Sequence, residues 1–129
     1  MSRKLDDLSP RFRPLAIELL ARCCEAGAPV MIVDTLRTAA EQEANIAKGV
    51  SWTRNSKHLT GDAIDIVPYQ LWDASGPDKL QWDARAPVWH LLGQIGESLG
   101  LVWGGRWKVK DMGHFEYPTP PADTTTRRA

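Results

Sequence analysis

A single carboxylate stands in the middle of an apolar run of the chain. Residues 63–67 read Ala-Ile-Asp-Ile-Val, and the charge belongs to Asp65. Burying an unpaired charge costs roughly several kcal/mol. In a β-strand, however, alternate side chains share a face, so Ile64 and Ile66 point one way and Asp65 the other. The run therefore predicts a strand with one apolar face under helices and a second face on which the carboxylate needs a partner.

A second strand-like segment repeats this division of faces. In Gly-His-Phe-Glu-Tyr near the end of the chain, His114 and Glu116 share one face and Phe115 takes the other. His58, one of the three histidines of the chain, lies in a polar loop just before the strand of Asp65. Two histidines and an aspartate would make a zinc site with a fourth position left for water, as catalytic zinc sites require. The alternative is that Asp65 faces solvent on a half-exposed sheet.

Hydrophobic periods and end signals predict the remaining elements. Ser9 followed by proline predicts the start of a first helix, and apolar residues at helical spacing carry it as far as Gly27. Thr-Ala-Ala-Glu beginning at Thr38 matches a capping box and predicts a second helix that Gly49 ends. Further patterns predict strands at 29–33 and 62–68, a third helix from Pro87 to Gly100, and a closing hairpin over 101–117.

These elements predict one small α+β domain at residues 1–117, with helices packed on one antiparallel sheet. Two segments, 50–61 and 69–86, show no clear period and are predicted to be loops. Residues 118–129 cannot bury anything and are predicted to form a flexible C-terminal tail. A chain of 129 residues suits one domain with a single core.

Composition argues against several classes of function. The 16 basic and 16 acidic residues give a formal charge of zero, and without a basic stripe nucleic-acid binding is not expected. No apolar run approaches the ~20 residues of a membrane span, and the charged start of the sequence lacks the apolar stretch of a secretory signal peptide. The two cysteines, Cys23 and Cys24, are adjacent and are expected to be reduced thiols on a helix. The fold is therefore expected to stand without disulfides.

Three segments resemble, in order, those of one enzyme family. The first is Arg37 with the Thr-Ala-Ala-Glu-Gln that follows it, similar to an Arg-Ser/Thr-x-x-x-Gln segment. The second runs Ser56-x-His58-x-x-Gly61-x-Ala63-x-Asp65. The third joins Trp-Gly-Gly at 103–105 to Asp-Met-Gly-His-Phe-Glu at 111–116. Together they resemble the zinc D,D-carboxypeptidase and L-alanyl-D-glutamate peptidase family, which includes VanY-type enzymes and many bacteriophage endolysins.

The resemblance implies a role for five residues and a fold. It implies that His58, Asp65 and His114 bind zinc. It places Asp111 where the family keeps its catalytic carboxylate, and Arg37 where the family has an arginine near the reacting carbonyl. The implied fold is a hedgehog/D,D-peptidase-like domain whose antiparallel sheet carries the zinc site.

Further residues are expected to contact substrate. The resemblance makes Ser56 a substrate-contacting or site-shaping hydroxyl, and an ordinary loop residue is an equal alternative. Gln42 is a candidate substrate contact, with a solvated helix residue as its alternative. Trp103 and Trp107 flank the proposed site and are expected to line a groove for a stem peptide. Packing positions are expected for the other tryptophans, namely Trp52, Trp72, Trp82 and Trp89. The third histidine, His90, is expected to be a surface or packing residue.

Two positions depart from the family pattern. Arg106 stands where an acidic or amide residue is expected in many relatives, and Gly113 stands where a proline is common. Neither is one of the implied ligands, but both could alter the substrate groove.

The function implied by the resemblance is a zinc-dependent peptidoglycan peptidase that hydrolyses a stem-peptide bond, with L-Ala–D-Glu as the expected bond. The expected setting is a phage endolysin, monomeric and held in the host cytoplasm until a separate membrane-permeabilising partner lets it reach the wall. One alternative is a D-Ala-D-Ala carboxypeptidase or dipeptidase with the same site. Another is a zinc-bearing module that binds wall peptides without cutting them, although such a module would not need Asp111.

Overall fold

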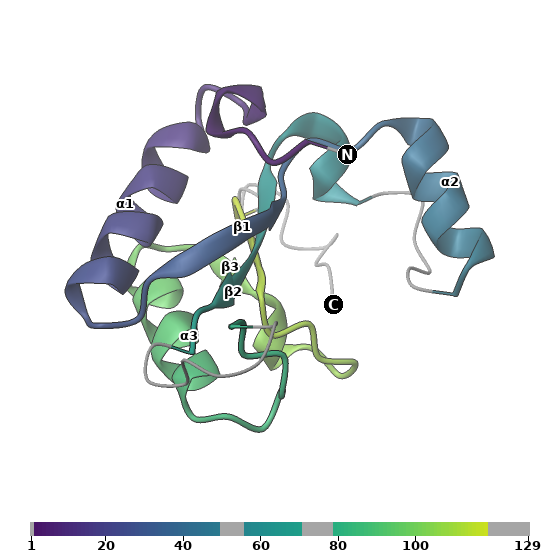
Figure 1. The fold of residues 1–129 in the computed structure, drawn as a ribbon. Coiled ribbons are helices and arrows are strands. Elements are labelled where there is room, and N and C mark those ends of the chain that lie inside the picture. The colour runs from purple at the N-terminus through teal and green to yellow at the C-terminus, as the bar shows by residue number, and fades with distance from the viewer. Residues whose placement is uncertain (1, 50–55, 71–78, 119–129) are drawn as a thin grey trace.

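The computed structural model describes residues 2–49, 56–70 and 79–118 (Figure 1). Over these residues the helices are α1 (Arg13–Glu25), α2 (Ala39–Ala47) and α3 (Val88–Ser98). The strands are β1 (Val30–Asp34), β2 (Ala63–Pro68), β3 (Val102–Trp103) and β4 (His114–Glu116). Short 3₁₀ helices lie between them as η1 (Leu5–Asp7), η2 (Lys57–Thr60) and η3 (Gly104–Arg106).

The described strands form one antiparallel sheet in the order β1-β2-β4-β3. On one side β2 pairs with β1, with a shift of register between Ile32 and Asp34. On its other side β2 pairs with β4, so that Asp65 lies opposite His114. The register thus brings together an aspartate and a histidine that lie 49 residues apart in the chain.

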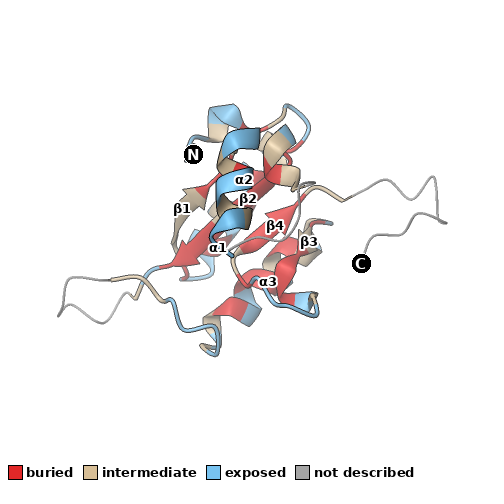
Figure 2. Ribbon diagram, turned by 90° about the vertical axis from the view of Figure 1, so that its right-hand side faces the viewer, coloured by how far each residue is buried: buried red, intermediate tan, exposed pale blue. Residues whose placement is uncertain are grey.

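Helices α1 and α3 cover the apolar face of this sheet, and α2 lies beyond the other face (Figure 1). Leu19 of α1 and Leu92 of α3 share one buried core with Ile64, Ile66 and Phe115 of the strands. Figure 2 shows β2 and β4 as part of this buried layer. The predicted α+β class, with helices packed on one antiparallel sheet, is confirmed.

Two glycines allow α3 to pack closely against the sheet. A β-carbon at Gly93 would lie 2.5 Å from the ring of Trp103, and one at Gly96 would lie 2.4 Å from the ring of Phe115. Interiors are packed as densely as organic crystals, so neither ring has room to withdraw without disturbing its neighbours. The glycines therefore fix β3 and β4, and the histidine that β4 carries, relative to α3.

The predicted start of the first helix is wrong by one turn. Helix α1 begins at Arg13, and Ser9 instead caps the turn before it, its Oγ accepting a hydrogen bond from the Phe12 N–H at 3.3 Å. The capping box predicted for the second helix is confirmed, since Thr38 Oγ1 accepts from the Glu41 N–H and the Glu41 side chain accepts from the Thr38 N–H.

The segments around the ligand candidates differ in detail from the predictions. The predicted loop 50–61 contains a 3₁₀ helix, η2, in its described part. The closing hairpin is present as the pair β3 and β4, but β4 pairs only from His114, because residues 104–113 form η3 and turns. Residues 71–78 of the predicted loop 69–86, and residues 119–129 of the predicted tail, lie outside the described residues. The domain boundary at residue 117 and the flexible tail therefore stay predictions.

The predicted thiols are present on α1. Cys23 is buried, Cys24 is exposed, and both are free. Burial raises the pKa of the Cys23 thiol to about 11. Over the described part of the chain, no helix is both long enough and apolar enough to cross a membrane.

The tryptophans expected to pack do not all do so. Trp89 is buried in the core, as expected. Trp82 is 55% exposed, so the packing position expected for it is wrong. Trp52 and Trp72 lie outside the described residues.

Candidate metal centre

A short 3₁₀ turn places His58 against the sheet. Ser56 caps η2, its Oγ accepting a hydrogen bond from the His58 N–H at 3.2 Å. Gly61 ends the turn at φ 75°, a left-handed conformation that favours glycine, and a β-carbon there would lie 2.8 Å from the backbone nitrogen of Ser9. Serine, histidine and glycine at this spacing therefore form a turn that buries His58, which is only 2% exposed.

The three residues predicted as ligands come together on the polar face of the sheet. Asp65 Oδ1 lies 3.0 Å from His114 Nδ1 and 3.2 Å from His58 Nε2. The two imidazole rings stand 75° apart, with their centroids separated by 5.2 Å. One donor atom from each residue lies within 4.8 Å of the other two, a spacing that could hold a metal ion.

Each histidine ring is held at the nitrogen that faces away from Asp65. His58 Nδ1 lies 2.7 Å from the carbonyl oxygen of Thr35, so this nitrogen carries the proton and donates it. His114 Nε2 lies 2.8 Å from Glu116 Oε1. Hydrogen bonds of this kind orient metal-binding histidines and fix their tautomers. They leave His58 Nε2 and His114 Nδ1 directed at the carboxylate of Asp65.

The residues present fit a metal ion. In a neutral His58 that donates from Nδ1, Nε2 bears only a lone pair, and this atom is buried without a hydrogen-bond partner in the described part of the chain. The lone pair faces a carboxylate oxygen of Asp65 at 3.2 Å, an arrangement of two acceptors that a cation between them would satisfy. Two imidazole nitrogens and one carboxylate oxygen are the kind of donor set that catalytic zinc sites use, with the fourth position open.

The electrostatics of the metal-free chain also favour a positive charge at this place. Burial lowers the pKa of His114, but its hydrogen bonds to Asp65 and Glu116 outweigh burial and raise the pKa to about 10. Burial raises the pKa of Asp65, but the hydrogen bond with His114 and the nearby His58 ring outweigh burial and lower that pKa. Without a metal, the site therefore holds a proton tightly, and a metal ion would take its place.

Arg37 lies beside the three ligand candidates and is held by two buried side chains. Its Nε and Nη2 donate to Asp34 Oδ2, and its Nη1 donates to Gln42 Oε1 at 2.6 Å. Its Nη2 also lies 3.8 Å from Asp65 Oδ2. Gln42 is only 1% exposed, so it is neither the solvated helix residue nor the substrate contact that the sequence left open. It orients Arg37 instead.

Asp111 approaches the same place from the turn before β4. Its Oδ2 lies 3.9 Å from His114 Nδ1, and 54% of its side chain is exposed. Its N–H donates to the Gly104 carbonyl and its own carbonyl accepts from the His114 N–H, which anchors the turn. Partial burial raises the pKa of the Asp111 carboxyl, and the negative charge of Asp65 adds to the effect. A carboxylate that reaches both solvent and the ligand cluster is suited to exchange protons with a water molecule.

The two tryptophans expected to line a groove occupy different environments. The ring of Trp107 is half-buried and lies 4.9 Å from the ring of His114, between centroids, so it flanks the site. Trp103 is 3% exposed, and its Nε1 donates to the carbonyl of Met112 inside the core. The groove-lining position expected for Trp103 is therefore wrong. Ser56 is half-buried and shapes the site through its bond to the His58 backbone.

The two departures from the family pattern have structural explanations. Arg106 makes two hydrogen bonds of 2.9 Å to Glu97 of α3 and lies over the ring of Trp103, so it ties η3 to the helix. At Gly113 a β-carbon would lie 2.2 Å from the carbonyl oxygen of Ile66. Any larger residue there, proline included, would need β2 to shift.

Sequence reasoning missed three residues that orient the side chains of the site. Thr35 holds His58, Glu116 holds His114, and Asp34 holds Arg37. Thr35 acts through its backbone carbonyl, so its side chain gives no signal. Asp34 follows a β-branched strand pattern and appears from sequence to be a strand end. Glu116 could have been found, because it shares a strand face with His114, but it was not among the predicted site residues.

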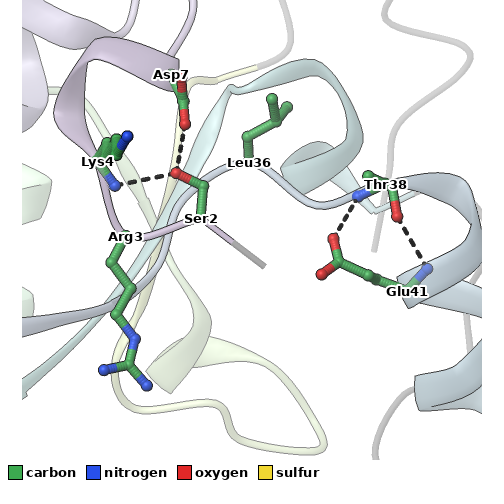
Figure 3. Close-up of a pocket in the computed structure, with 7 residues that line it drawn as sticks. All are labelled: Ser2, Arg3, Lys4, Asp7, Leu36, Thr38 and Glu41. Carbon is green, nitrogen blue, oxygen red and sulfur yellow. Dashed lines mark hydrogen bonds between the residues drawn. The ribbon is translucent and has the colours of Figure 1, made fainter.

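A shallow groove of about 590 Å³ lies between the N-terminal segment and the start of α2 (Figure 3). Its walls include Leu36 and Thr38, the two neighbours of Arg37, together with Ser2, Arg3, Lys4, Asp7 and Glu41. None of the three ligand candidates lines this groove. The candidate site is therefore identified by the convergence of donor atoms from His58, Asp65 and His114.

Comparison with known proteins identifies the family. Residues 49–117, more than half of the chain, match a family described as D-alanyl-D-alanine carboxypeptidase. The chain belongs to this peptidase family. It is 31% identical over 123 residues to the peptidoglycan L-alanyl-D-glutamate endopeptidase CwlK of Bacillus subtilis (strain 168), a match that covers 85% of this chain and 73% of the relative.

Two phage proteins are also similar. The chain is 33% identical over 115 residues to the L-alanyl-D-glutamate peptidase of Listeria phage A118, covering 88% of this chain and 39% of that protein. It is 37% identical over 93 residues to the L-alanyl-D-glutamate peptidase of Escherichia phage T5, covering 66% of this chain and 64% of that protein. The chain thus spans less than two thirds of the length of either phage relative.

A solved structure supports the fold. The crystal structure of the Serratia marcescens L-Ala D-Glu endopeptidase ChiX superimposes with a TM-score of 0.65 at 27% sequence identity, covering 88% of this chain and 83% of that one. The family predicted from the three sequence segments is confirmed, and with it the small α+β fold.

Proposed function

We propose that the protein is a zinc-dependent peptidase that hydrolyses a stem-peptide bond of peptidoglycan, the bond between L-Ala and D-Glu. The observation that carries the proposal is the convergence of His58, Asp65 and His114 beside an oriented arginine, Arg37, and a half-exposed carboxylate, Asp111. The three relatives described as L-alanyl-D-glutamate peptidases support the choice of bond.

In the proposed mechanism, a zinc ion held by His58, Asp65 and His114 would supply a Lewis acid and an activated water molecule at neutral pH. Asp111 accepts the proton of the attacking water and passes it to the leaving amine. The guanidinium of Arg37 donates a hydrogen bond to the oxygen on which negative charge develops. Asp34 and Gln42 hold the guanidinium before substrate arrives, so little reorganisation is needed at the moment of reaction.

The substrate contacts are proposed on exposure. Trp107 is half-buried beside His114 and offers a flat apolar wall to a stem peptide. Ser56 lies in the turn that carries His58 and has part of its surface in solvent, so it is the second candidate contact.

The biological setting belongs to the same proposal. Similarity to two phage peptidases supports an endolysin that lyses a bacterial host. Such a protein would act as a monomer, stay in the host cytoplasm, and reach the wall after a separate partner has permeabilised the membrane. Its substrate partner would be the stem peptide of the bacterial wall, without involvement of nucleic acid.

A second candidate function is favoured by one observation. The family that matches residues 49–117 is described as D-alanyl-D-alanine carboxypeptidase. The same ligands and the same carboxylate would serve that reaction, since only the position of the scissile bond changes.

Mass spectrometry of the fragments released from purified peptidoglycan by the zinc-loaded protein tests both candidates. Cleavage between L-Ala and D-Glu would release peptides that begin with D-Glu and leave L-Ala on the glycan. Release of terminal D-Ala alone would support the carboxypeptidase. Binding of wall fragments with no cleavage would refute both and favour a binding module.

A further inference from the structure

A buried carboxylate lies next to the ligand cluster without being one of the ligands. Glu116 is 3% exposed and sits in β4, where its neighbours across the sheet are Ala63 of β2 and Val102 of β3. A carboxylate buried in such a place needs partners for its oxygens. The partners of the two Glu116 oxygens therefore indicate the role of this carboxylate.

Each oxygen of this carboxylate lies near a nitrogen of another side chain. Oε1 lies 2.8 Å from His114 Nε2, and Oε2 lies 3.5 Å from Lys57 Nζ. Lys57 is itself anchored, because its Nζ donates to the carbonyl of Tyr117 at 2.6 Å. A lysine with only 16% of its side chain exposed is thus held where it compensates the charge of Glu116.

The other histidine has a different support. His58 Nδ1 donates to a backbone carbonyl, that of Thr35, which is neutral. His114 instead donates to a carboxylate. A carboxylate withdraws the proton of an imidazole more strongly than an amide carbonyl does, and so makes the opposite nitrogen a better electron donor. The two histidines are therefore unequal, although both direct a nitrogen at Asp65.

We infer that Glu116 is a positioning residue of the metal centre. It fixes His114 in the tautomer that carries its proton on Nε2 and presents the lone pair of Nδ1 to the metal, and its charge strengthens that ligand. Lys57, the residue before His58, pairs with the other oxygen of Glu116. The Lys57–Glu116 ion pair therefore links η2, which carries one histidine, to β4, which carries the other. This inference rests on the metal centre proposed above.

The first test is the zinc affinity of Glu116→Gln, measured on metal-free protein by competition with a chromophoric chelator. Glutamine keeps the size and one acceptor oxygen but removes the charge. We expect zinc to bind about 10–100-fold more weakly than to the wild type. The matched control is Glu97→Gln. Glu97 lies on α3, pairs with Arg106 of η3 and, in the described part of the chain, makes no hydrogen bond or ion pair with a ligand candidate. The zinc affinity of this variant should equal that of the wild type.

Circular dichroism and thermal melting of the metal-free proteins separate this role from a purely structural one. A Glu116→Gln protein that melts at a lower temperature but binds zinc within twofold of the wild type would overturn the inference. If wild-type protein binds no zinc, the metal centre and this inference fail together. If wild type binds and Glu116→Gln binds equally well, only the inference fails.

A second measurement needs no variant and holds even if Glu116→Gln does not fold. Long-range ¹H–¹⁵N NMR spectra of the zinc-loaded wild type report which ring nitrogen of each histidine is protonated. We expect His58 to be protonated on Nδ1 and His114 on Nε2, with the His114 proton shifted further downfield and protected from exchange. Protonation of His114 on Nδ1 would contradict the inference.

Discussion

The ligand candidates and the proposed catalytic residues are held in different ways. His58, Asp65 and His114 come from a short 3₁₀ helix and from two paired strands, and both histidines are nearly buried, with 2% and 7% of their side chains exposed. Asp111 comes from a turn, and 54% of its side chain is exposed. Arg37 follows the end of β1 and depends on two buried hydrogen-bond partners.

This difference indicates a division of tasks. A metal site needs donor atoms fixed to within a fraction of an ångström, and backbone pairing in a sheet supplies that accuracy. A group that moves protons must reach water and substrate, and so it needs exposure. Changes to the first set should therefore act on metal content, and changes to the second set on turnover with the metal retained.

The largest effect is expected from removing a ligand. His58→Ala and His114→Ala should each lose most bound zinc and nearly all hydrolysis, because two remaining ligands hold zinc poorly. Metal analysis of purified protein, together with clearing of a wall suspension, measures both. His90→Ala is the control, because His90 lies on the surface of α3 with its ring against Trp103. This variant and the wild type should each carry about one zinc per chain. Full zinc occupancy in His58→Ala would contradict the ligand assignment.

Removing the proposed proton acceptor should separate turnover from metal binding. Asp111→Asn has nearly the same shape but cannot accept a proton at neutral pH. We expect it to keep its zinc and its fold and to lose about 10²–10⁴-fold in hydrolysis rate. Loss of zinc in this variant would make Asp111 a ligand, and the contrast between the two sets of residues would then break down.

A smaller effect is expected at the arginine. Arg37→Lys keeps the charge but loses the planar fork that Asp34 and Gln42 hold. We expect kcat to fall about 10²–10³-fold, the range for the loss of one oxyanion donor, with a smaller change in KM. A large rise in KM at unchanged kcat would reassign Arg37 to substrate binding.

The parts of the site that could be predicted from sequence are those that depend on local spacing. The period-two pattern placed Asp65 and His114 on one face of two strands, and the structure pairs them directly. The loop predicted over 50–61, which carries His58, ends at Gly61, the residue that caps η2 in the structure. The environment of Trp103 could not be predicted, because the space beside Gly93 that its ring fills is a property of packing across the sheet.

Supporting contacts between distant segments were equally inaccessible to sequence reasoning. Gln42 lies one turn into α2 and was predicted to face solvent or substrate, yet it is buried and accepts a hydrogen bond from Arg37. His58 is held by the backbone carbonyl of Thr35, which lies 23 residues earlier in the chain. A pattern of side chains in the sequence cannot indicate which backbone carbonyl will accept such a hydrogen bond. Long-range partners of this kind appear only once the fold is known.

The smallest effect is expected outside both sets of residues, at Asp62, just before β2. This carboxylate is buried and accepts hydrogen bonds from Ser9, Thr60 and Arg11. Burial raises its pKa, but the hydrogen bonds from Arg11 and the two hydroxyls outweigh burial and lower the pKa to about 2 from the ordinary 3.8. A carboxyl with a lowered pKa in the folded state stabilises the protein above about pH 4, and this contribution is lost as the pH falls toward 2.

Asp62→Asn should therefore reduce the free energy of unfolding at pH 7 by at most about 2 kcal/mol, the equivalent of that shift in pKa, and by less if solvent screens the exposed Arg11. Below about pH 2 its stability should approach that of the wild type, because the wild-type carboxyl is then protonated as well. Urea denaturation at a series of pH values measures this, with EDTA present so that metal release does not contribute. Glu18→Gln, which removes an exposed carboxylate paired with Arg22 on α1, is the control and should leave the stability curve nearly unchanged. Because Asp62 touches neither set of residues, kcat of the zinc-loaded Asp62→Asn protein at neutral pH should equal that of the wild type. A loss of turnover there would show that the start of β2 transmits strain to Asp65, and that the ligand set is less independent of its surroundings than its burial indicates.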